Sequence, residues 1–369
     1  MKNIDLLAQP YQVTDIDKKL LKASIAAYGV YGCLWDAQDK KFDSYSTWET
    51  LKEYGGNPVG FTKGTVYVSG RAGINACYLA ETENEIILTF RATATTSADG
   101  LAAGILDWFL SDFKANPVTD SEFGEGQVHK GFRDAVSSLM RCHGRISEAH
   151  VVLETTLLDD IIHAVNASPK KKFHIVGYSK GSGLAPLAAM YLMNNAKNKE
   201  SRIKASRIES VHIFEAPRCG NEQFRAHYNW ILGDVTKRFE YQYDIVPHLP
   251  PMKTSLKYLK KVDEKLYNEL NLFYLGELNE WHYQSVGNLI HINVKNDITQ
   301  YPEYWADLRF EMENFGNLGE LSKSDGSFKK ALGEVIQKYH VPYGINSDGK
   351  AYGIASVICH GEEWPFPLK

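Results

Sequence analysis

The pentapeptide Gly177-Tyr178-Ser179-Lys180-Gly181 restricts the local fold more than any other part of the sequence. It directly follows the apolar run 173–176 and precedes the helix-like stretch 184–192. A strand that turns sharply into a helix around G-x-S-x-G is typical of a nucleophile elbow. The two glycines leave room for a tight turn, and the strained turn holds the serine hydroxyl clear of the backbone.

The pattern alone is weakly specific, because its three fixed positions occur by chance in about one chain in eight of this length. The bare pentapeptide also fits an ordinary Gly/Ser-rich turn between a strand and a helix. The strand before it and the Ala-rich helix after it favour the elbow. Because peptide N–H groups at the start of a helix can receive an oxyanion, Ser179 is predicted to be a nucleophile for acyl transfer.

Bulk composition excludes several classes of protein. The chain has 369 residues, 44% hydrophobic and 23% charged, which suits a large buried core. Its formal net charge of -4 argues against a nucleic-acid partner. The five cysteines are widely spaced and indicate neither a disulfide framework nor a metal site, so no metal or cofactor is predicted.

Targeting signals are absent from the sequence pattern. Segment 1–12 lacks the apolar stretch of a signal peptide, and no later segment resembles a membrane span. We therefore expect a cytoplasmic location by default and no integral membrane span, with secretion by another route left open. The most basic segment, 253–265, is typical of a solvated helix, and contact with an anionic lipid surface is the alternative.

Hydrophobic periodicity predicts an α/β fold. Strand-like and helix-like runs alternate along the second half of the chain, which favours a mostly parallel central sheet flanked by helices. No linker or internal repeat interrupts the chain, so a single domain over 1–369 is predicted. The expected helices are 15–28, 128–165 (broken near Gly144), 183–195 and 222–229, and the expected strands are 65–68, 76–79, 85–90, 173–176, 210–214, 238–243 and 287–294.

Segment 251–285 interrupts this alternation. Its leucines recur at helical spacing and it is rich in aromatic residues. It is predicted to be a helical, cap-like insertion. One interpretation is a helical excursion packed on the core, and the other is part of a cap over a substrate-binding site.

In folds that carry a serine nucleophile on a strand–elbow–helix unit, the serine is followed along the chain by an acid and then by a histidine. Asp244 follows the predicted strand 238–243 and precedes a proline-punctuated loop, a position from which a carboxylate can orient a histidine. The alternative role for Asp244 is to initiate a turn. The carboxylate would fix the imidazole tautomer and stabilise the imidazolium.

The histidine is predicted from its place at the end of an element. His340 ends the helix-like run 327–340 and opens a loop that can lie over the carboxyl ends of the strands, where open α/β sheets have their active sites. His360 is the second choice. The catalytic histidine would take the proton of the Ser179 hydroxyl and return it to the leaving alcohol. The candidates considered are His248, His282, His291, His340 and His360.

Several segments together resemble the class 3 (fungal-type) lipase family, a branch of the α/β-hydrolases. The resemblance extends over residues 85–251, and the joint occurrence of its motifs is far more specific than the elbow alone. The segments that carry it are 86–93, 107–113, 128–132, 177–181, 214–221 and 244–251. The resemblance implies an α/β-hydrolase fold with lid or cap insertions.

The resemblance also implies roles for residues outside the predicted Ser-Asp-His triad. Thr93 and Lys180 would supply the backbone amides of an oxyanion hole. Segment 94–112 looks like the family's lid, which would cover an acyl pocket in water and open at a lipid surface; the alternative is a core-packed helix. The lid residues expected to contact substrate are Leu101, Ile105, Leu106, Trp108 and Phe109.

Four residues depart from the pattern of the family. Ala92 and Glu215 stand where the family has glycine, and Tyr178 and Lys180 replace a histidine and a leucine of the elbow. Lys180, next to the nucleophile, can alter substrate preference. His129 belongs to a motif that looks structural in the family, so it is given no catalytic role.

The predicted function is that of a serine carboxylic-ester hydrolase acting on lipid esters, similar to a triacylglycerol lipase, through an acyl-enzyme intermediate. Its partner would be a lipid ester or a lipid–water interface. A phospholipase A1 or a short-chain esterase would use the same residues. A different class of protein is also considered, a non-catalytic lipase-like protein that binds a lipid or a partner.

Overall fold

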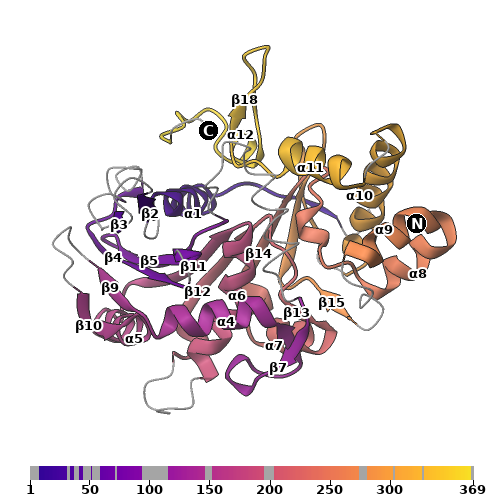
Figure 1. Cartoon of the computed structure of the whole chain (residues 1–369). Helices are drawn as coiled ribbons and strands as arrows, with labels where there is room; N and C mark the ends of the chain where they lie inside the picture. Colours follow the sequence, from indigo (N-terminus) through magenta and orange to yellow (C-terminus); the bar gives the residue numbers. More distant parts are fainter. Residues whose placement is uncertain are drawn as a thin grey trace.

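A large mixed β-sheet forms the centre of the computed structural model (Figure 1). The model describes residues 8–30, 34–36, 41–44, 51, 59–70, 73–93, 115–145, 152–194, 203–273, 281–301, 304–325 and 328–366. Within these residues the sheet has eleven strands in the order β1-β17-β16-β14-β12-β11-β6-β5-β4-β9-β10.

The strands of this sheet are short to medium in length. They are β1 (Gln9–Pro10), β4 (Lys63–Ser69), β5 (Asn75–Glu81), β6 (Glu85–Phe90), β9 (His143–Arg145), β10 (Val152–Thr156), β11 (Lys172–Tyr178), β12 (Ile208–Phe214), β14 (Thr236–Tyr241), β16 (Asn288–Ile292) and β17 (Ile298–Tyr301). A second sheet contains β7 (Pro117–Thr119), β8 (Gln127–His129), β13 (Gly220–Asn221) and β15 (Tyr283–Gln284). Two hairpins pair β2 (Leu34–Asp36) with β3 (Lys41–Ser44) and β18 (Gly344–Ile345) with β19 (Ala351–Tyr352).

Helices account for most of the remaining described chain. They are α1 (Asp15–Ala26), α4 (Lys130–Met140), α5 (Leu157–Ala167), α6 (Lys180–Asn194), α7 (Glu222–Leu232), α8 (Lys253–Val262), α9 (Glu264–Phe273), α10 (Tyr304–Asp325), α11 (Phe328–Tyr339) and α12 (Ile354–Ile358). Among the described helices, none is both long enough and apolar enough to cross a membrane.

The five central strands β6, β11, β12, β14 and β16 run parallel, which confirms the predicted α/β-hydrolase type of fold. Antiparallel strands extend the sheet on both sides, from β5 outward on one side and from β17 outward on the other. In β11, Gly177 pairs with Phe90 of β6 and Tyr178 pairs with Phe214 of β12. The carboxyl ends of these strands therefore meet at one edge of the sheet, where the elbow begins.

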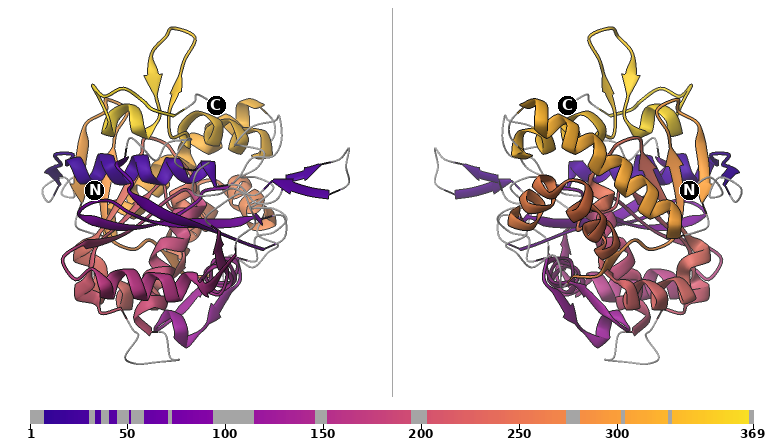
Figure 2. Two further views of the ribbon diagram at one scale, coloured as in Figure 1. Left: turned by 90° about the vertical axis from the view of Figure 1, so that its left-hand side faces the viewer. Right: turned by 90° about the vertical axis from the view of Figure 1, so that its right-hand side faces the viewer.

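Side chains of β11 alternate between two cores, one on each face of the sheet. Phe173 and Ile175 pack in the core that also contains residues of α4, α5, α6 and α7. Val176 and Tyr178 pack in the core that contains residues of α1 and α12. Figure 2 shows α1 on one side of the sheet and the magenta helices, which include α4, on the other. The near-continuous apolar run of β11 follows from this burial on both faces.

Most predicted elements are present, with ends that differ by a few residues. The exception is 128–165, which was expected to be a helix broken near Gly144. The structure instead has β8, α4, β9, β10 and α5 in this region. Pairing of β9 with β4 and β10 at the edge of the main sheet takes these residues out of a helix, and tertiary pairing of this kind overrides a local helical pattern.

Segment 251–285 contains the predicted helices, α8 and α9, followed by residues outside the described part of the chain and then by β15. Leu256 and Leu259 of α8, and Leu266 and Leu270 of α9, are buried in the core on the α6 side of the sheet. Their spacing therefore reflects packing on the body of the protein. A role for this segment as a substrate cap, and the extent of one domain over 1–369, stay predictions.

Asp17 fixes α1 to the sheet. Thr14 and Asp17 form a capping box, in which each side chain accepts a hydrogen bond from the other residue's backbone N–H. The buried Asp17 carboxylate also accepts hydrogen bonds from Tyr11 Oη (2.6 Å), His212 Nε2 (2.7 Å) and Lys237 Nζ (2.9 Å). Burial works to raise the pKa of Asp17, but the hydrogen bonds from His212, Tyr11 and Lys237 outweigh it and hold the pKa well below its usual range.

We predict that Asp17→Asn lowers the free energy of unfolding by about 3 kcal/mol at pH 7, because it removes the charge from a buried ion-paired group. A carboxylate with a lowered pKa stabilises the fold above its unfolded pKa of about 4, and this stabilisation is lost as the pH falls further. Urea unfolding at pH 7 and at lower pH should therefore show a difference from wild type that shrinks with acidification. Asp15→Asn, at an exposed position of the same helix turn, is the control, and an equal loss in the two variants would contradict this role.

Candidate active site

Ser179 lies on a strained turn between β11 and α6. Its φ angle is 53°, in the left-handed region that non-glycine residues rarely adopt. A Cβ atom added to Gly177 would lie 2.2 Å from the carbonyl carbon of Gly181, and one added to Gly181 would lie 2.2 Å from the oxygen of Phe90. The predicted need for glycine at both positions is confirmed, since either side chain would collide with backbone.

Hydrogen bonds fix this turn to the neighbouring strand β12. The Ser179 N–H donates to the oxygen of Phe214 (2.9 Å). The buried Ser182 hydroxyl lies within hydrogen-bond distance of Gly177 O (2.6 Å) and Phe214 O (2.8 Å), and it accepts from Phe214 N (2.9 Å). Ser182 was not singled out from the sequence, because a serine in the first turn of a helix carries no signal of such a bridge.

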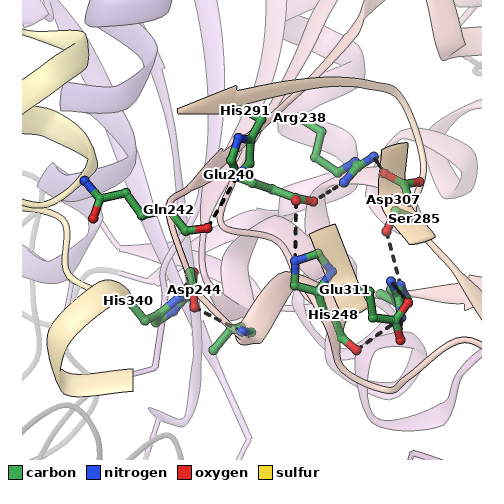
Figure 3. A network of polar contacts seen from close by, with 12 residues as sticks. Arg238, Glu240, Gln242, Asp244, His248, Ser285, His291, Asp307, Glu311 and His340 are labelled. Carbon is green, nitrogen blue, oxygen red and sulfur yellow. Dashed lines mark hydrogen bonds and ion pairs between the residues drawn. The ribbon is translucent and has the colours of Figure 1, made fainter. Parts of the chain in front are cut away.

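The structure brings together the three residues predicted from chain order. His340 Nε2 lies 2.6 Å from Ser179 Oγ, and His340 Nδ1 lies 2.6 Å from Asp244 Oδ2. All three residues are almost completely buried. Figure 3 shows Asp244 and His340 next to each other at the edge of a larger polar network. With Nδ1 hydrogen-bonded to a carboxylate, Nε2 is the nitrogen that can accept a proton from Ser179.

Asp244 and His340 are each oriented by their surroundings. Asp244 follows β14 in a turn, and its Oδ1 accepts a hydrogen bond from Val246 N (3.0 Å). His340 follows α11 and its N–H donates to Ile336 O (2.9 Å). The imidazole is stacked on the ring of Tyr178, with centroids 5.5 Å apart. Packing and hydrogen bonds therefore restrict both side chains before any substrate binds.

The other candidate histidines have different surroundings. His248 lies 3.8 Å from Glu240, His282 contacts Lys253, and His291 is stacked on Phe310. His360 is exposed near the end of the described chain. Of the five candidates, His340 is the one that contacts Ser179.

Thr93 and Lys180, the predicted oxyanion-hole residues, lie on neighbouring elements. Thr93 follows β6, and Lys180 is the first residue of α6. The Thr93 hydroxyl is buried and has no hydrogen-bond partner within the described residues. The Lys180 ammonium donates to Ile74 O (2.9 Å) and Asn75 Oδ1 (2.8 Å), so this side chain is bound at the start of β5.

Arg91 holds the backbone just before Thr93. Its buried guanidinium donates to Gly73 O (2.8 Å), Ile74 O (3.2 Å) and Val30 O. Burial lowers the pKa of Arg91 to about 10, and the group remains charged at neutral pH. The predicted lid, segment 94–112 with Leu101, Ile105, Leu106, Trp108 and Phe109, lies outside the described residues.

A buried ion pair supports the loop that carries Asp244. Arg218 donates to Glu311 through Nη2 (2.9 Å) and Nη1 (3.2 Å), and both side chains are fully or almost fully buried. Arg218 Nη1 also donates to His248 O (3.1 Å) and Pro250 O (2.9 Å). Because both carbonyls belong to the loop after Asp244 and Glu311 belongs to α10, this arginine connects the loop to α10.

A second buried cluster lies on β14. Arg238 is paired with Glu240 on the same strand and with Asp307 of α10. Burial raises the pKa of Glu240 to about 7, although the charge of Arg238 acts in the opposite direction. Burial also lowers the pKa of His291 to about 4, so this imidazole is neutral at physiological pH.

Glu215 also contacts His340, a position that the sequence did not reveal. Its carboxylate Oε2 lies 3.4 Å from His340 Nδ1, the same nitrogen that contacts Asp244. One ligand atom from each of Glu215, Asp244 and His340 lies within 4.8 Å of the other two, a grouping that could also hold a metal ion. The short contact between Nδ1 and Asp244 indicates a hydrogen bond between them, and a metal ion would have to displace its proton.

Comparisons with known proteins point to one family. The model of the family described as Lipase (class 3) matches residues 88–254. A search of curated proteins found no match. Among solved structures, the chain is similar to native Rhizomucor miehei lipase in its propeptide complex, with 17% identity, a TM-score of 0.50, and 84% of this chain and 79% of that chain covered.

Two further solved structures give the same result. A deletion mutant of the Rhizomucor miehei lipase propeptide complex has 16% identity and a TM-score of 0.52, with 84% of this chain and 78% of that chain covered. M37 lipase has 17% identity and a TM-score of 0.52, with 88% of this chain and 98% of that chain covered. At this level of identity, the similarity shows a shared fold.

We predict that Gly181→Ala destabilises the protein by at least about 2 kcal/mol and lowers esterase activity at least about 100-fold, since the new methyl group overlaps the Phe90 carbonyl. Gly316→Ala is the matched control, because Gly316 is exposed in α10 and a Cβ there meets no atom within 4 Å. This control should gain about 0.5–1 kcal/mol of stability. The stability and activity of both variants are measured by thermal unfolding and by ester hydrolysis. Full activity of Gly181→Ala would contradict the close contact between Gly181 and the Phe90 carbonyl.

Proposed function

Residues 88–254 belong to the class 3 lipase family of ester hydrolases, and from this we propose that the protein is a serine hydrolase of lipid esters with Ser179, His340 and Asp244 as its catalytic triad. The observation that carries the proposal is the pair of contacts at the imidazole. Nε2 lies 2.6 Å from Ser179 Oγ and Nδ1 lies 2.6 Å from Asp244 Oδ2. These distances are within the reach needed for proton transfer and for orientation of the base.

The proposed reaction has two halves. Ser179 Oγ attacks the ester carbonyl carbon while His340 Nε2 takes its proton, and Asp244 stabilises the imidazolium through Nδ1–H. The imidazolium then gives the proton to the departing alcohol oxygen, which leaves an acyl-enzyme. Water, deprotonated by His340, attacks the acyl carbon, and the proton returns to Ser179 as the acid is released.

An oxyanion hole formed by the backbone amides of Thr93 and Lys180 would stabilise both tetrahedral intermediates. The Lys180 N–H lies at the positive end of the α6 dipole. The Thr93 hydroxyl, which has no hydrogen-bond partner within the described residues, would act as a third donor. Loss of one such donor costs about 3–4 kcal/mol of transition-state stabilisation in comparable sites. The role of these two residues is part of the proposal.

The substrate class that we propose is a lipid ester of the triacylglycerol type at a lipid–water interface. A phospholipase A1 or a short-chain esterase would use the same chemistry. A non-catalytic lipid- or partner-binding protein is the candidate of another class. The contact between His340 and Ser179 argues against it, because a binding protein has no need of a base positioned on a serine hydroxyl.

We predict that a fluorophosphonate probe labels wild-type protein covalently on Ser179, since His340 increases the nucleophilicity of the hydroxyl. Labelling and ester hydrolysis should disappear in Ser179→Ala, and His340→Ala should lower kcat at least about 1,000-fold. His360→Ala is the matched control, because His360 is exposed, and it should keep wild-type activity. Labelling that persists in Ser179→Ala, or loss of activity in His360→Ala alone, would contradict the assignment.

We also predict that hydrolysis of a series of nitrophenyl esters favours medium or long acyl chains and increases when the substrate forms an interface. This result follows if the active site takes lipid acyl groups. Kcat/KM for acetate, butyrate, octanoate and palmitate esters, measured below and above the solubility limit, provides the readout. Activity confined to acetate and butyrate without an increase at the interface would favour a short-chain esterase instead.

A further inference from the structure

Glu215 places a second buried acid against the catalytic histidine. It directly follows β12, its φ angle is 53°, and its N–H donates to Phe239 O (2.8 Å). The side chain is completely buried, with Oε2 3.4 Å from His340 Nδ1. Asp244 approaches the same nitrogen from the loop after the adjacent strand β14. Two acids from the ends of neighbouring parallel strands therefore converge on one N–H group.

Tyr178 connects Glu215 to the elbow. Its hydroxyl donates a hydrogen bond to Glu215 Oε2, and its ring is stacked on His340. Glu215 Oε1 has no hydrogen-bond partner within the described residues. One tyrosine from the elbow thus contacts both the second acid and the imidazole. The ionisable groups that act on Glu215 or respond to its charge are Tyr178, Glu240, Tyr241, Asp244 and His340.

The two acids oppose each other's ionisation, because two buried carboxylates this close repel each other. Burial raises the pKa of Glu215 well above its usual range, and the negative charge of Asp244 raises it further, against the effect of the Tyr178 hydrogen bond. Glu215 is therefore the neutral carboxylic acid of the pair. Asp244 Oδ2, at 2.6 Å from Nδ1, is the nearer acceptor for the imidazole N–H.

We propose that Glu215, whose Oε2 lies 3.4 Å from His340 Nδ1, is a positioning residue for His340 that can orient the imidazole in place of Asp244 when Asp244 is replaced by a neutral residue. This inference rests on the proposed function of the Ser179 site. In the wild-type protein, Oε2 gives Nδ1–H a second and longer acceptor. When Asp244 is made neutral, burial still raises the pKa of Glu215, but the negative charge that raised it further is removed. Glu215 therefore ionises at lower pH than in the wild-type protein and then binds the Nδ1–H group as a carboxylate.

The test is a double-mutant cycle of Asp244→Asn, Glu215→Gln and the double variant, with kcat and KM measured from pH 5 to 10. Loss of a triad acid without a substitute lowers kcat about 10⁴-fold. We expect Asp244→Asn to lose about 10- to 100-fold only, with kcat rising with pH as Glu215 ionises. The double variant should lose at least about 100-fold more and lack this pH-dependent rise. Equal activity of Asp244→Asn and the double variant at every pH would overturn the proposal.

Tyr178→Phe in the Asp244→Asn background is the matched control for mechanism. This substitution keeps an aromatic ring over His340 but removes the hydrogen bond that Tyr178 donates to Glu215. Without that donor, the ionised form of Glu215 is less stable relative to its protonated form. The pH-dependent rise in kcat should move to higher pH by at least about 0.5 unit. If Glu215 had a purely structural role, the pH dependence of kcat would be the same with and without the Tyr178 hydroxyl. An unchanged pH dependence would therefore contradict the proposal.

A second comparison applies if Asp244→Asn does not fold, as judged by circular dichroism. In otherwise wild-type protein, Glu215→Gln keeps a polar group beside Nδ1 and Tyr178, whereas Glu215→Met does not. We expect Glu215→Met to have a kcat at least about 10-fold below that of Glu215→Gln, with KM similar. Equal kcat values would overturn the proposal. Fluorophosphonate labelling of wild type but not Ser179→Ala tests the proposed function separately, so the two failures can be told apart.

Discussion

Backbone strain at the carboxyl edge of the sheet is the constraint on which the candidate site depends. Four described non-glycine residues have positive φ angles, and three of them, Ser179, Glu215 and Gln242, directly follow the adjacent parallel strands β11, β12 and β14. Each such residue costs about 1–3 kcal/mol, which the surrounding structure must offset. Here the offset comes from the sheet ladder, from burial on both faces and from the Ser182 bridge between β11 and β12. The strained backbone at these three strand ends directs the segments that carry Ser179, Glu215 and Asp244 toward His340.

The buried ion pairs behind the site determine geometry more than stability. Removing charged groups from water costs several kcal/mol per ion, and well-formed pairs only approximately repay it. The Arg218–Glu311 pair is nonetheless completely enclosed, and Arg218 binds two carbonyls of the loop that follows Asp244. An apolar pair of similar volume would fill the same space but could not bind those carbonyls. We therefore interpret this ion pair as the element that fixes the loop after Asp244 in a single conformation.

The sequence was sufficient to predict three residues that the structure brings into contact, because their expected chemistry is tied to their order along the chain. Ser179 came from a local motif, and Asp244 and His340 came from their places at the ends of a strand and a helix. Sequence could not reveal Glu215, because its carboxylate reaches His340 only through the positive φ angle and the pairing of β12 with β14. The error at 128–165 has a similar origin, since β9 pairs with the distant strand β4 as well as with β10. Contacts set by strand order and backbone strain are not encoded in any single stretch of the chain.

The distribution of charged partners around the site is consistent with a neutral Glu215 beside Asp244. Arg218 and Arg238 are paired with Glu311, Glu240 and Asp307, away from the imidazole. Within the described part of the chain, no ion pair joins Asp244 or Glu215 to an arginine or lysine, so His340 is their shared cationic partner. One negative charge is then available for one imidazolium, and a second ionised acid would have no counter-ion. In the proposed reaction, proton transfer from Ser179 to His340 would create the single positive charge that this pair of acids can stabilise.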